Sequence, residues 1–166
     1  MAIINSKFFG ELEYDEKSDF EYIEAIFEEN GKEHNVDISL SDCNMYGDKI
    51  NICKDIIDKY PQVCEIANLA IVNAFSKDET VKDYFLFHFD NLKNTVLVKL
   101  FGTDNFANFD VKKTMQKISF PSLLFSLDDN EIVLSVDYKI SEEDSDEMLC
   151  VKMNAKLEVT GFTQES

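Results

Sequence analysis

The stretch FEYIEAIFEENGKEHNVDISL, residues 20–40, carries the pattern from which the architecture of this chain can be inferred. Apolar and polar residues alternate on both sides of a central Asn30-Gly31, with Ile23 among the apolar positions before it and Val36 among those after it. Alternation with a period of two is typical of a half-buried strand. Asn and Gly tolerate the positive φ that a tight hairpin turn requires. The stretch therefore predicts an antiparallel hairpin with one face in the core and one facing outward.

Further strand patterns lie at both ends of the chain. Each alternates apolar and polar residues or is bounded by turn residues such as Asp128-Asp129-Asn130. With the hairpin strands Phe20–Glu28 and Val36–Leu40, the expected strands are Phe8–Tyr14, Ser119–Leu127, Ile132–Tyr138, Met148–Met153 and Leu157–Thr163. The sequence thus predicts about seven strands, three of them N-terminal and about four C-terminal.

The middle of the chain has helical periodicity instead. Apolar residues recur every three or four positions from Ile50 to Tyr60, and Pro61 suits the first turn of a second helix that extends to Phe75. Ser76-Lys77-Asp78-Glu79 reads as a capping box before a third helix. A further helical stripe can end at Gly102, and a short helix is expected near residues 110–117.

Strands followed by helices and then strands predict an α+β protein. We expect a single α+β domain over residues 1–166, in which an antiparallel sheet packs one face against the central block of helices. The other face, with Glu11, Glu13, Tyr22, Glu24, Asp37 and Ser39 as candidates, would meet water or a partner.

Charge restricts the partners more than any motif does. The chain has 16 lysines, no arginine and 33 acidic residues, a formal net charge of -17. Residues 1–42 hold twelve acids against three lysines, and residues 128–147 hold nine against one. Phosphate recognition relies on clustered Lys and Arg, so nucleic acid is disfavoured. Anionic lipid would repel this surface, no apolar run is long enough to span a bilayer, and like charges favour a monomer over a homo-oligomer.

The four cysteines, Cys43, Cys53, Cys64 and Cys150, form no CxxC pair, and polar residues follow Met1–Ile4 at once. This pattern favours a reducing cytoplasm and no secretory leader. No known phosphate-binding, nucleophile-elbow or zinc-protease motif is present, and the carboxylates of residues 142–147 lack the spacing of a calcium loop. We therefore expect no cofactor and no metal site.

Two functional hypotheses remain. The first is a non-enzymatic protein whose acidic surface docks a basic partner, with charge complementarity speeding association. Its candidate contacts are Glu11, Glu13, Glu24, Glu28, Glu29, Glu142, Glu143 and Asp144. The second is an enzyme or small-ligand-binding protein with a pocket between sheet and helices. Its candidate polar groups are Cys43, Tyr84 and His88, although His88 lies between Phe85 and Phe89 on an apolar helical face, where a hydrogen-bonded core residue is the commoner outcome.

Three stretches resemble a bacterial family known as domain of unknown function 2004 (DUF2004). They are FFGELEYD at Phe8–Asp15, VKDYFLFHFDNL at Val81–Leu92, and the ending from VDYKI at Val136 to Ser166. The resemblance spans most of the chain and implies a small cytoplasmic α+β protein. The family carries no established activity or catalytic residue to transfer. The association of such families with immunity against contact-delivered toxins suggests a toxin or nuclease domain as the basic partner.

Overall fold

The computed structural model describes residues 2–15, 22–40, 47–118 and 120–166, and the strands within these ranges form two sheets. In chain order the strands are β1 (Ala2–Ser6), β2 (Gly10–Tyr14), β3 (Tyr22–Glu29), β4 (Lys32–Leu40), β5 (Ser122–Asp128), β6 (Glu131–Lys139), β7 (Met148–Asn154) and β8 (Val159–Glu165). The helices are α1 (Asp48–Ile57), α2 (Tyr60–Ala74), α3 (Glu79–Asn91), α4 (Asn94–Phe101) and α5 (Val111–Lys117), with a short 3₁₀ helix at Phe106–Asn108.

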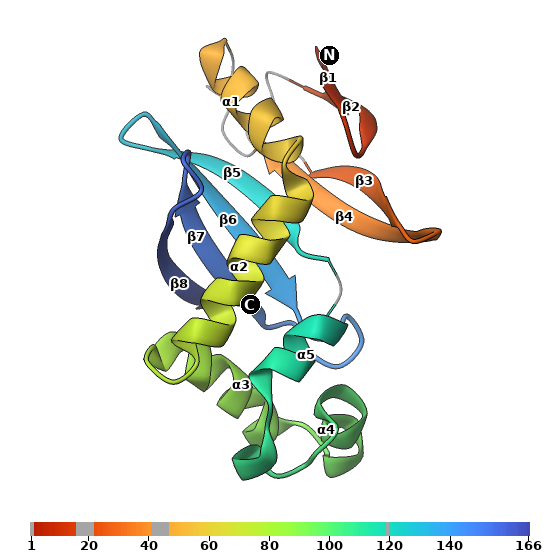
Figure 1. The fold of residues 1–166 in the computed structure, drawn as a ribbon, viewed down its shortest axis with the longest axis vertical. Coiled ribbons are helices and arrows are strands. Elements are labelled where there is room, and N and C mark those ends of the chain that lie inside the picture. Colours follow the sequence, from red (N-terminus) through yellow and green to blue (C-terminus); the bar gives the residue numbers. More distant parts are fainter. Residues whose placement is uncertain (1, 16–21, 41–46, 119) are drawn as a thin grey trace.

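The larger sheet has six strands within the described ranges, in the order β3-β4-β5-β6-β7-β8. Neighbouring strands are antiparallel except β4 and β5, which are parallel. The whole helical block lies between these two strands in the sequence and crosses one face of the sheet, so β5 starts at the same end as β4 (Figure 1). The expectation of a purely antiparallel sheet is therefore wrong for this one pair.

The N-terminal strands are divided between the two sheets. The strand expected at Phe8–Tyr14 begins only at Gly10, and it pairs with the unexpected strand β1, with Ile4 opposite Leu12. The Ser6 hydroxyl accepts hydrogen bonds from the amides of Phe8 and Phe9 at 3.3 and 3.2 Å, which stabilises the turn between the strands. The predicted three-stranded opening is thus a separate two-stranded sheet followed by the β3–β4 hairpin.

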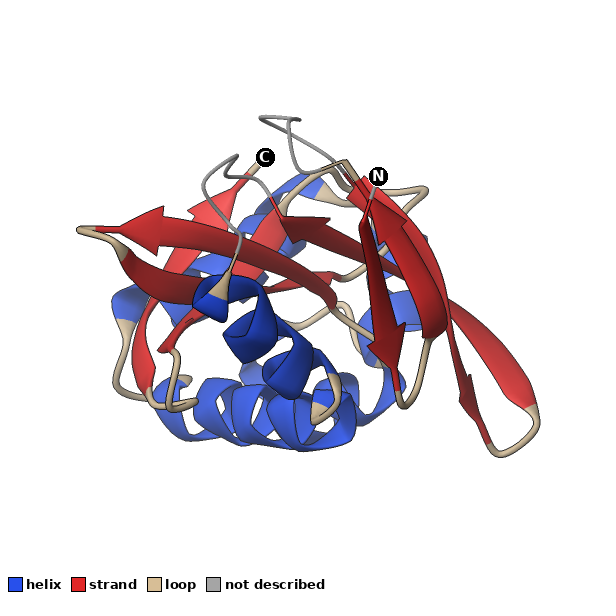
Figure 2. Cartoon of the chain, turned by 90° about the horizontal axis from the view of Figure 1, so that it is seen from above, coloured by secondary structure: helices blue, strands red, loops and turns tan. Residues whose placement is uncertain are grey.

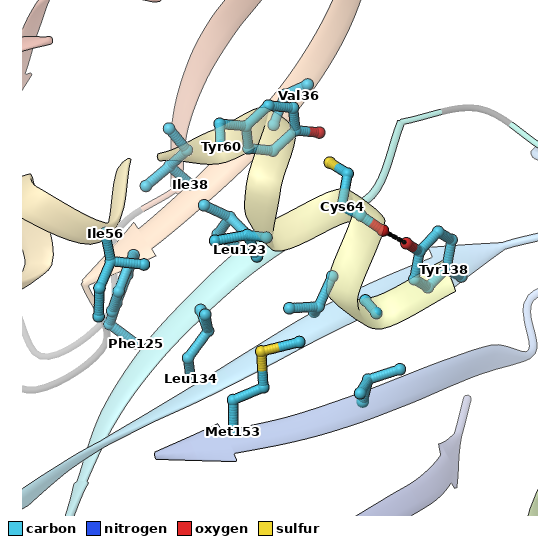
Figure 3. Packing of buried hydrophobic residues seen from close by; sticks show 14 of the residues in the cluster. Val36, Ile38, Ile56, Tyr60, Cys64, Leu123, Phe125, Leu134, Tyr138 and Met153 are labelled. Carbon is cyan, nitrogen blue, oxygen red and sulfur yellow. Dashed lines mark hydrogen bonds between the residues drawn. The ribbon is translucent and has the colours of Figure 1, made fainter. Parts of the chain in front are cut away.

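Helices cover one face of the six-stranded sheet, as Figure 2 shows from above. Tyr60, at the start of α2, is fully buried, and its hydroxyl donates to the Pro121 carbonyl at 2.6 Å. Val36, Ile38 and Leu123 are buried beneath it on β4 and β5 (Figure 3). Fully burying one such aliphatic side chain contributes about 1.5–3 kcal/mol. The α+β class with helices on one face is confirmed.

Some of the turn and cap signals in the sequence are confirmed and one is wrong. Asn30 and Gly31 have the positive φ expected of the hairpin turn, and Gly102 ends α4 in the left-handed conformation. The capping box predicted from Ser76 is wrong, because Asp78 is the N-cap of α3 and its carboxylate accepts from the Val81 amide at 3.2 Å. No helix in the described part of the chain has the length and apolarity needed to cross a membrane.

Candidate functional site

The β3–β4 hairpin presents one face to the helices and the other outward. The alternation of burial along both strands separates the two sets of side chains. The outward set, called the hairpin face below, consists of Tyr22, Glu24, Ile26 and Glu28 from β3 and Glu33, Asn35, Asp37 and Ser39 from β4. Ser39 alone in this set is fully buried, and its hydroxyl has no hydrogen-bond partner among the described residues.

Acidic residues of the hairpin face stand directly opposite one another. Glu24 pairs with Asp37, and Glu28 pairs with Glu33. The Asp37 amide points away from β3, because it donates to the Ser122 hydroxyl at 3.4 Å. By the period of two, both acid pairs therefore occupy ladder positions that are not hydrogen-bonded to each other, where side chains approach most closely. Like charges in this arrangement destabilise a sheet.

The four opposed carboxylates are not neutralised by ion pairs within the described part of the chain. The pKa of the Asp37 carboxyl is raised, first by burial and then by the negative charges of Glu24 and Glu142. The pKa of the Tyr22 phenol is raised by burial and then by neighbouring carboxylates, Asp137 foremost. The hairpin face is thus a region of concentrated negative potential.

Two large apolar side chains lie within this acidic surface. Tyr22 is 55% exposed and Ile26 is 51% exposed, and both project from β3 between or beside the glutamates. Protein interfaces are enriched in aromatic anchors within a polar rim. The hairpin face therefore combines the composition of an interface with a single sign of charge.

Two hollows meet at the hairpin face and together form what we call the acidic groove. A hollow of about 310 Å³ lies over Glu24, Ile26, Asn35 and Asp37. A second of about 460 Å³ shares Asn35 and Asp37 and extends toward β5 and β6. The residues lining the second hollow are Glu33, His34, Asn35, Asp37, Phe120, Ser122, Asp137, Lys139 and Glu142. The cation of this lining, Lys139, already lies 3.4 Å from Glu142 and 3.9 Å from Asp146.

Asp137 lines the groove on β6 and belongs to a hydrogen-bonded cluster. Its carboxylate accepts from the Ser135 hydroxyl, and Lys152 Nζ donates to the same hydroxyl at 3.0 Å. Burial raises the pKa of Asp137, while hydrogen bonds from Ser135 and Cys150 and the charge of Lys152 oppose that rise. This carboxylate is partly compensated from within the protein, unlike the opposed pairs of the hairpin.

The second acidic segment, residues 141–147, is held down by hydrogen bonds. We call it the acidic loop. The Ser141 hydroxyl donates to the Asp144 carboxylate at 2.9 Å, and the Tyr84 hydroxyl donates to the Glu147 carbonyl at 3.1 Å. His88 is fully buried beneath the loop, with Nδ1 2.7 Å from the Tyr84 carbonyl and Nε2 2.8 Å from the Ser145 hydroxyl.

These contacts fix the roles of the two side chains from the small-ligand hypothesis. Because a carbonyl can only accept, Nδ1 of His88 carries the proton and Nε2 accepts from Ser145. Burial lowers the pKa of His88, against opposing effects of the Tyr84 carbonyl and Glu147. Neither Tyr84 nor His88 lines a hollow described here. Both side chains instead fasten the acidic loop to α3. Cys43, the third candidate, lies outside the described residues.

The eight partner-contact candidates from the sequence lie in different places. Glu24, Glu28 and Glu142 lie at the hairpin face or the groove, whereas Glu11 and Glu13 are exposed on β2 in the other sheet. Glu143 and Asp144 are in the acidic loop, away from the groove lining. Glu29 lines a separate hollow at the end of the hairpin. The structure brings three of the eight candidates together.

That separate hollow, of about 530 Å³, lies between the hairpin, α2 and α5. Its lining includes Cys64, Asn68, Met115 and Tyr138. The Tyr138 hydroxyl already donates to Asn68 Oδ1 at 2.5 Å, and burial raises the pKa of the Cys64 thiol to about 12. A protonated thiol is a weak nucleophile. The hollow thus offers a space between sheet and helices in which the Tyr138 hydroxyl is already paired and the Cys64 thiol is protonated.

Sequence reasoning missed the residues that complete the groove. Glu33, Asn35 and Asp137 were not among the candidate contacts, although the alternation of the hairpin could have placed Glu33 and Asn35 beside Asp37. Asp137 could not be found in this way, because its place depends on the order of strands in the sheet. Within the described ranges, no group of three or more His, Cys, Asp or Glu side chains is arranged to hold a metal ion.

Comparison of the chain with protein-family models, curated proteins and solved structures gives no match. The resemblance to the bacterial family is neither supported nor opposed by these comparisons and stays a prediction.

Proposed function

We propose that the protein is a non-enzymatic binding domain that docks a basic protein partner on its hairpin face and acidic groove. The observation that carries the proposal is the direct opposition of Glu24 to Asp37 and of Glu28 to Glu33. Such pairs destabilise the free protein, since their charges repel at close range. Lysine or arginine side chains placed between them would convert the repulsion into attraction.

The apolar side chains of the face support a protein partner over a small cation. Tyr22 and Ile26 expose more than half of their surface within the acidic rim. Binding energy at protein interfaces is concentrated in a few buried aromatic and aliphatic anchors, while charges set specificity and the rate of association. Tyr22 and Ile26 are therefore the expected anchors, and the carboxylates select a basic surface.

The identity of the partner is proposed only by class. A net charge of -17 favours association with a strongly basic protein and disfavours acidic competitors. The family resemblance adds the proposal that the domain neutralises a basic toxin, as immunity proteins do. Charge complementarity alone would serve any partner with a compact lysine- and arginine-rich surface.

The test is a pull-down from lysate of the source cells at low and high salt, with three baits. These are the wild-type protein, Glu24→Lys/Glu28→Lys on the hairpin face, and Asp83→Lys/Asp90→Lys on the exposed side of α3. The two variants change net charge equally. We expect a basic protein that the wild type and the α3 variant retain at low salt, that the hairpin variant loses, and that high salt releases.

Equal capture by the two variants would contradict the proposal, because the hairpin face would then contribute no more to binding than the exposed acids of α3. Capture that is insensitive to salt would contradict the electrostatic basis. Circular dichroism of each bait at the pull-down temperature verifies that a lost interaction does not reflect unfolding.

A second candidate function is small-ligand binding in the hollow between the hairpin, α2 and α5. The observation in its favour is the volume of about 530 Å³ beside the polar groups of Asn68 and Tyr138. The Tyr138 hydroxyl is already paired, which weakens this candidate. A thermal-shift screen of metabolites against the wild type and Asn68→Ala tests it, and a ligand that stabilises only the wild type would place the site there.

A further inference from the structure

Strand β4 has an open edge beside the acidic groove. It pairs with β3 from Lys32 to Ser39 but with β5 only from Ile38 to Leu40. Within the described chain, β4 therefore lacks a ladder partner on its β5 side before residue 38. An open edge of this kind presents a row of backbone donors and acceptors to another chain.

The start of β5 explains why the ladder is short. Pro121 has no amide hydrogen to contribute to a ladder. Its carbonyl accepts from the Tyr60 hydroxyl at 2.6 Å, which directs it toward α2. The ring of Phe120 packs edge-to-face on that of His34, with 4.6 Å between centroids. Phe120 and Pro121, which directly precede β5, thus make their contacts on the helix side of the sheet.

The backbone groups of the open edge point into the groove. The Asp37 amide donates to Ser122 on β5, so the Asp37 N–H and C=O face away from β3. Because strand residues alternate in direction, the backbone groups of Asn35 and Glu33 face the same way. All three residues line the hollow of about 460 Å³.

The groove occupies the place that an earlier start of β5 would fill. Ser122, the first residue of β5, is level with Asp137 on β6, so Lys139 extends beyond the end of β5. The hollow lies between β4 on one side and Asp137 and Lys139 on the other. Between β4 and β6, before β5 starts, the larger sheet therefore has room for one further strand segment.

We propose that this edge takes up an extended segment of the basic partner as an added strand, paired with the backbone of residues 33–37. The inference rests on the proposed function and specifies how the partner is held. Strand addition gives affinity through main-chain hydrogen bonds, and alternate side chains give specificity. Alternate residues of the added strand would lie beside Glu33 and Asp37, which selects lysine or arginine at every second position.

A second copy of this chain is a poor occupant of the edge. Its own open edge carries Glu33 and Asp37, and each copy has a net charge of -17. Like charges on paired edges oppose such a ladder. A concentration-dependent dimer that competes with the peptide probe described below would overturn the proposal in favour of self-association.

The experiment uses a fluorescent peptide of about eight residues, a common strand length, with alternating Lys and Thr. Fluorescence anisotropy measures its binding to the full protein. A second peptide with the same sequence is N-methylated on the residues whose amides would face β4, and a third has the opposite set N-methylated. We expect one methylated peptide to bind roughly tenfold or more weakly and the other to bind like the parent, because only one set of amides joins the ladder.

A variant of the protein tests the same backbone hydrogen bonds from the side of β4. Asn35→Pro removes one amide hydrogen that faces the groove and leaves the ladder to β3 intact, so it is expected to weaken the parent peptide roughly tenfold. Asn35→Ala keeps the backbone and serves as its control. The methylated peptides need no variant, so they decide the outcome if Asn35→Pro fails to fold.

The outcomes separate this inference from the proposed function. If both methylated peptides bind as well as the parent and Glu24→Lys/Glu28→Lys still abolishes binding, the partner docks by charge alone and strand addition is wrong. If the Lys-Thr peptide binds no better than a Glu-Thr peptide, the added strand is overturned, while the pull-down still decides whether a folded basic partner exists.

Discussion

The hairpin face and the acidic loop are both rich in carboxylates, yet the protein treats them differently. In the acidic loop, the Asp144 carboxylate accepts from Ser141, and buried His88 binds Ser145 from below. On the hairpin face, Glu24 and Glu28 stand opposite Asp37 and Glu33 without compensating cations among the described residues. The acidic loop, which is the densest run of acids in the sequence, is therefore better stabilised by hydrogen bonds than the hairpin face.

Charge density along the sequence is therefore a poor guide to an electrostatic binding surface. Five carboxylates in residues 142–147 have room to spread into water and to use local hydrogen bonds. A strand offers no such freedom, because its pairing holds opposed side chains close together. Repulsion between carboxylates that a rigid hairpin holds together is therefore better evidence for a binding surface than repulsion that a loop can relax.

The largest expected effect on stability comes from removing the side chain that holds the acidic loop. His88→Ala removes a fully buried ring together with hydrogen bonds to the Tyr84 carbonyl and the Ser145 hydroxyl. We expect the free energy of unfolding to fall by about 2–4 kcal/mol, measured by urea denaturation. His34→Ala, at the other histidine, is the control and should lower it by less than half as much, since His34 is only partly buried. Equal losses would show that the loop is not fastened through His88.

The next largest effect is the stability gained by removing the repulsion on the hairpin face of the unbound protein. Glu24→Lys/Glu28→Lys turns two opposed acid pairs into ion pairs and should raise the free energy of unfolding by about 1 kcal/mol at low salt. Glu143→Lys, in the acidic loop, should change it by only a few tenths of that amount. The gain should shrink in high salt. A hairpin variant less stable than the wild type at low salt would contradict the repulsion that we infer.

The pH dependence of stability sharpens the same contrast. The pKa of Asp37 is raised in the folded protein, so the stabilisation from its protonated form is present below the ordinary carboxyl pKa of 3.8 and is lost as pH rises through the folded value. Asp37→Asn cannot ionise, so it does not lose stability as pH rises. We expect the variant to be more stable than the wild type at pH 7 by about 0.5 kcal/mol and equally stable near pH 3.

Asp58 is the matched control for this titration. Burial would raise its pKa, but hydrogen bonds from the Lys7 amide and Lys54 outweigh that and lower it. Its stabilisation is present above the ordinary pKa and is lost as pH falls through the folded value. Asp58→Asn should therefore be less stable than the wild type at pH 7, with the difference disappearing in acid. The same sign at pH 7 for both variants would contradict these assignments.

The smallest effect lies at the base of the hairpin face. The Ser39 hydroxyl is buried without a hydrogen-bond partner among the described residues. Removing an unsatisfied buried hydroxyl relieves its desolvation, so Ser39→Ala should leave stability unchanged or raise it by about 0.5 kcal/mol. Ser135→Ala is the control, because that hydroxyl bridges Asp137 and Lys152, and its loss should destabilise the protein. Thermal unfolding of both variants measures the difference.

Much of the fold follows from local patterns. Alternation around Asn30-Gly31 predicts the hairpin, and helical periodicity predicts the central helices. Strand β1 was missed, because its short sequence AIINS has too few alternating positions to distinguish it from a terminal extension. The parallel pairing of β4 with β5 was also missed, since it depends on the path of the helical block rather than on residues near either strand.

The candidate site was predictable only in part. Glu24 and Glu28 follow from the alternation of β3, and Tyr22 and Asp37 belonged to the outward face from the start. The groove requires β6 to lie one strand beyond β5, which places Asp137 and Lys139 across from β4. No local pattern carries that information. The roles of Tyr84 and His88 likewise depend on a loop more than fifty residues away in the sequence.

The most direct measurement is an NMR titration of the isotope-labelled protein with the alternating Lys-Thr peptide, following every backbone amide. We expect shift changes concentrated in residues 22–37 and at the groove positions 122, 137 and 139, with little change at 143–146. Changes concentrated in the acidic loop, with the hairpin unaffected, would contradict the claim that the opposed acids of the hairpin form the docking surface.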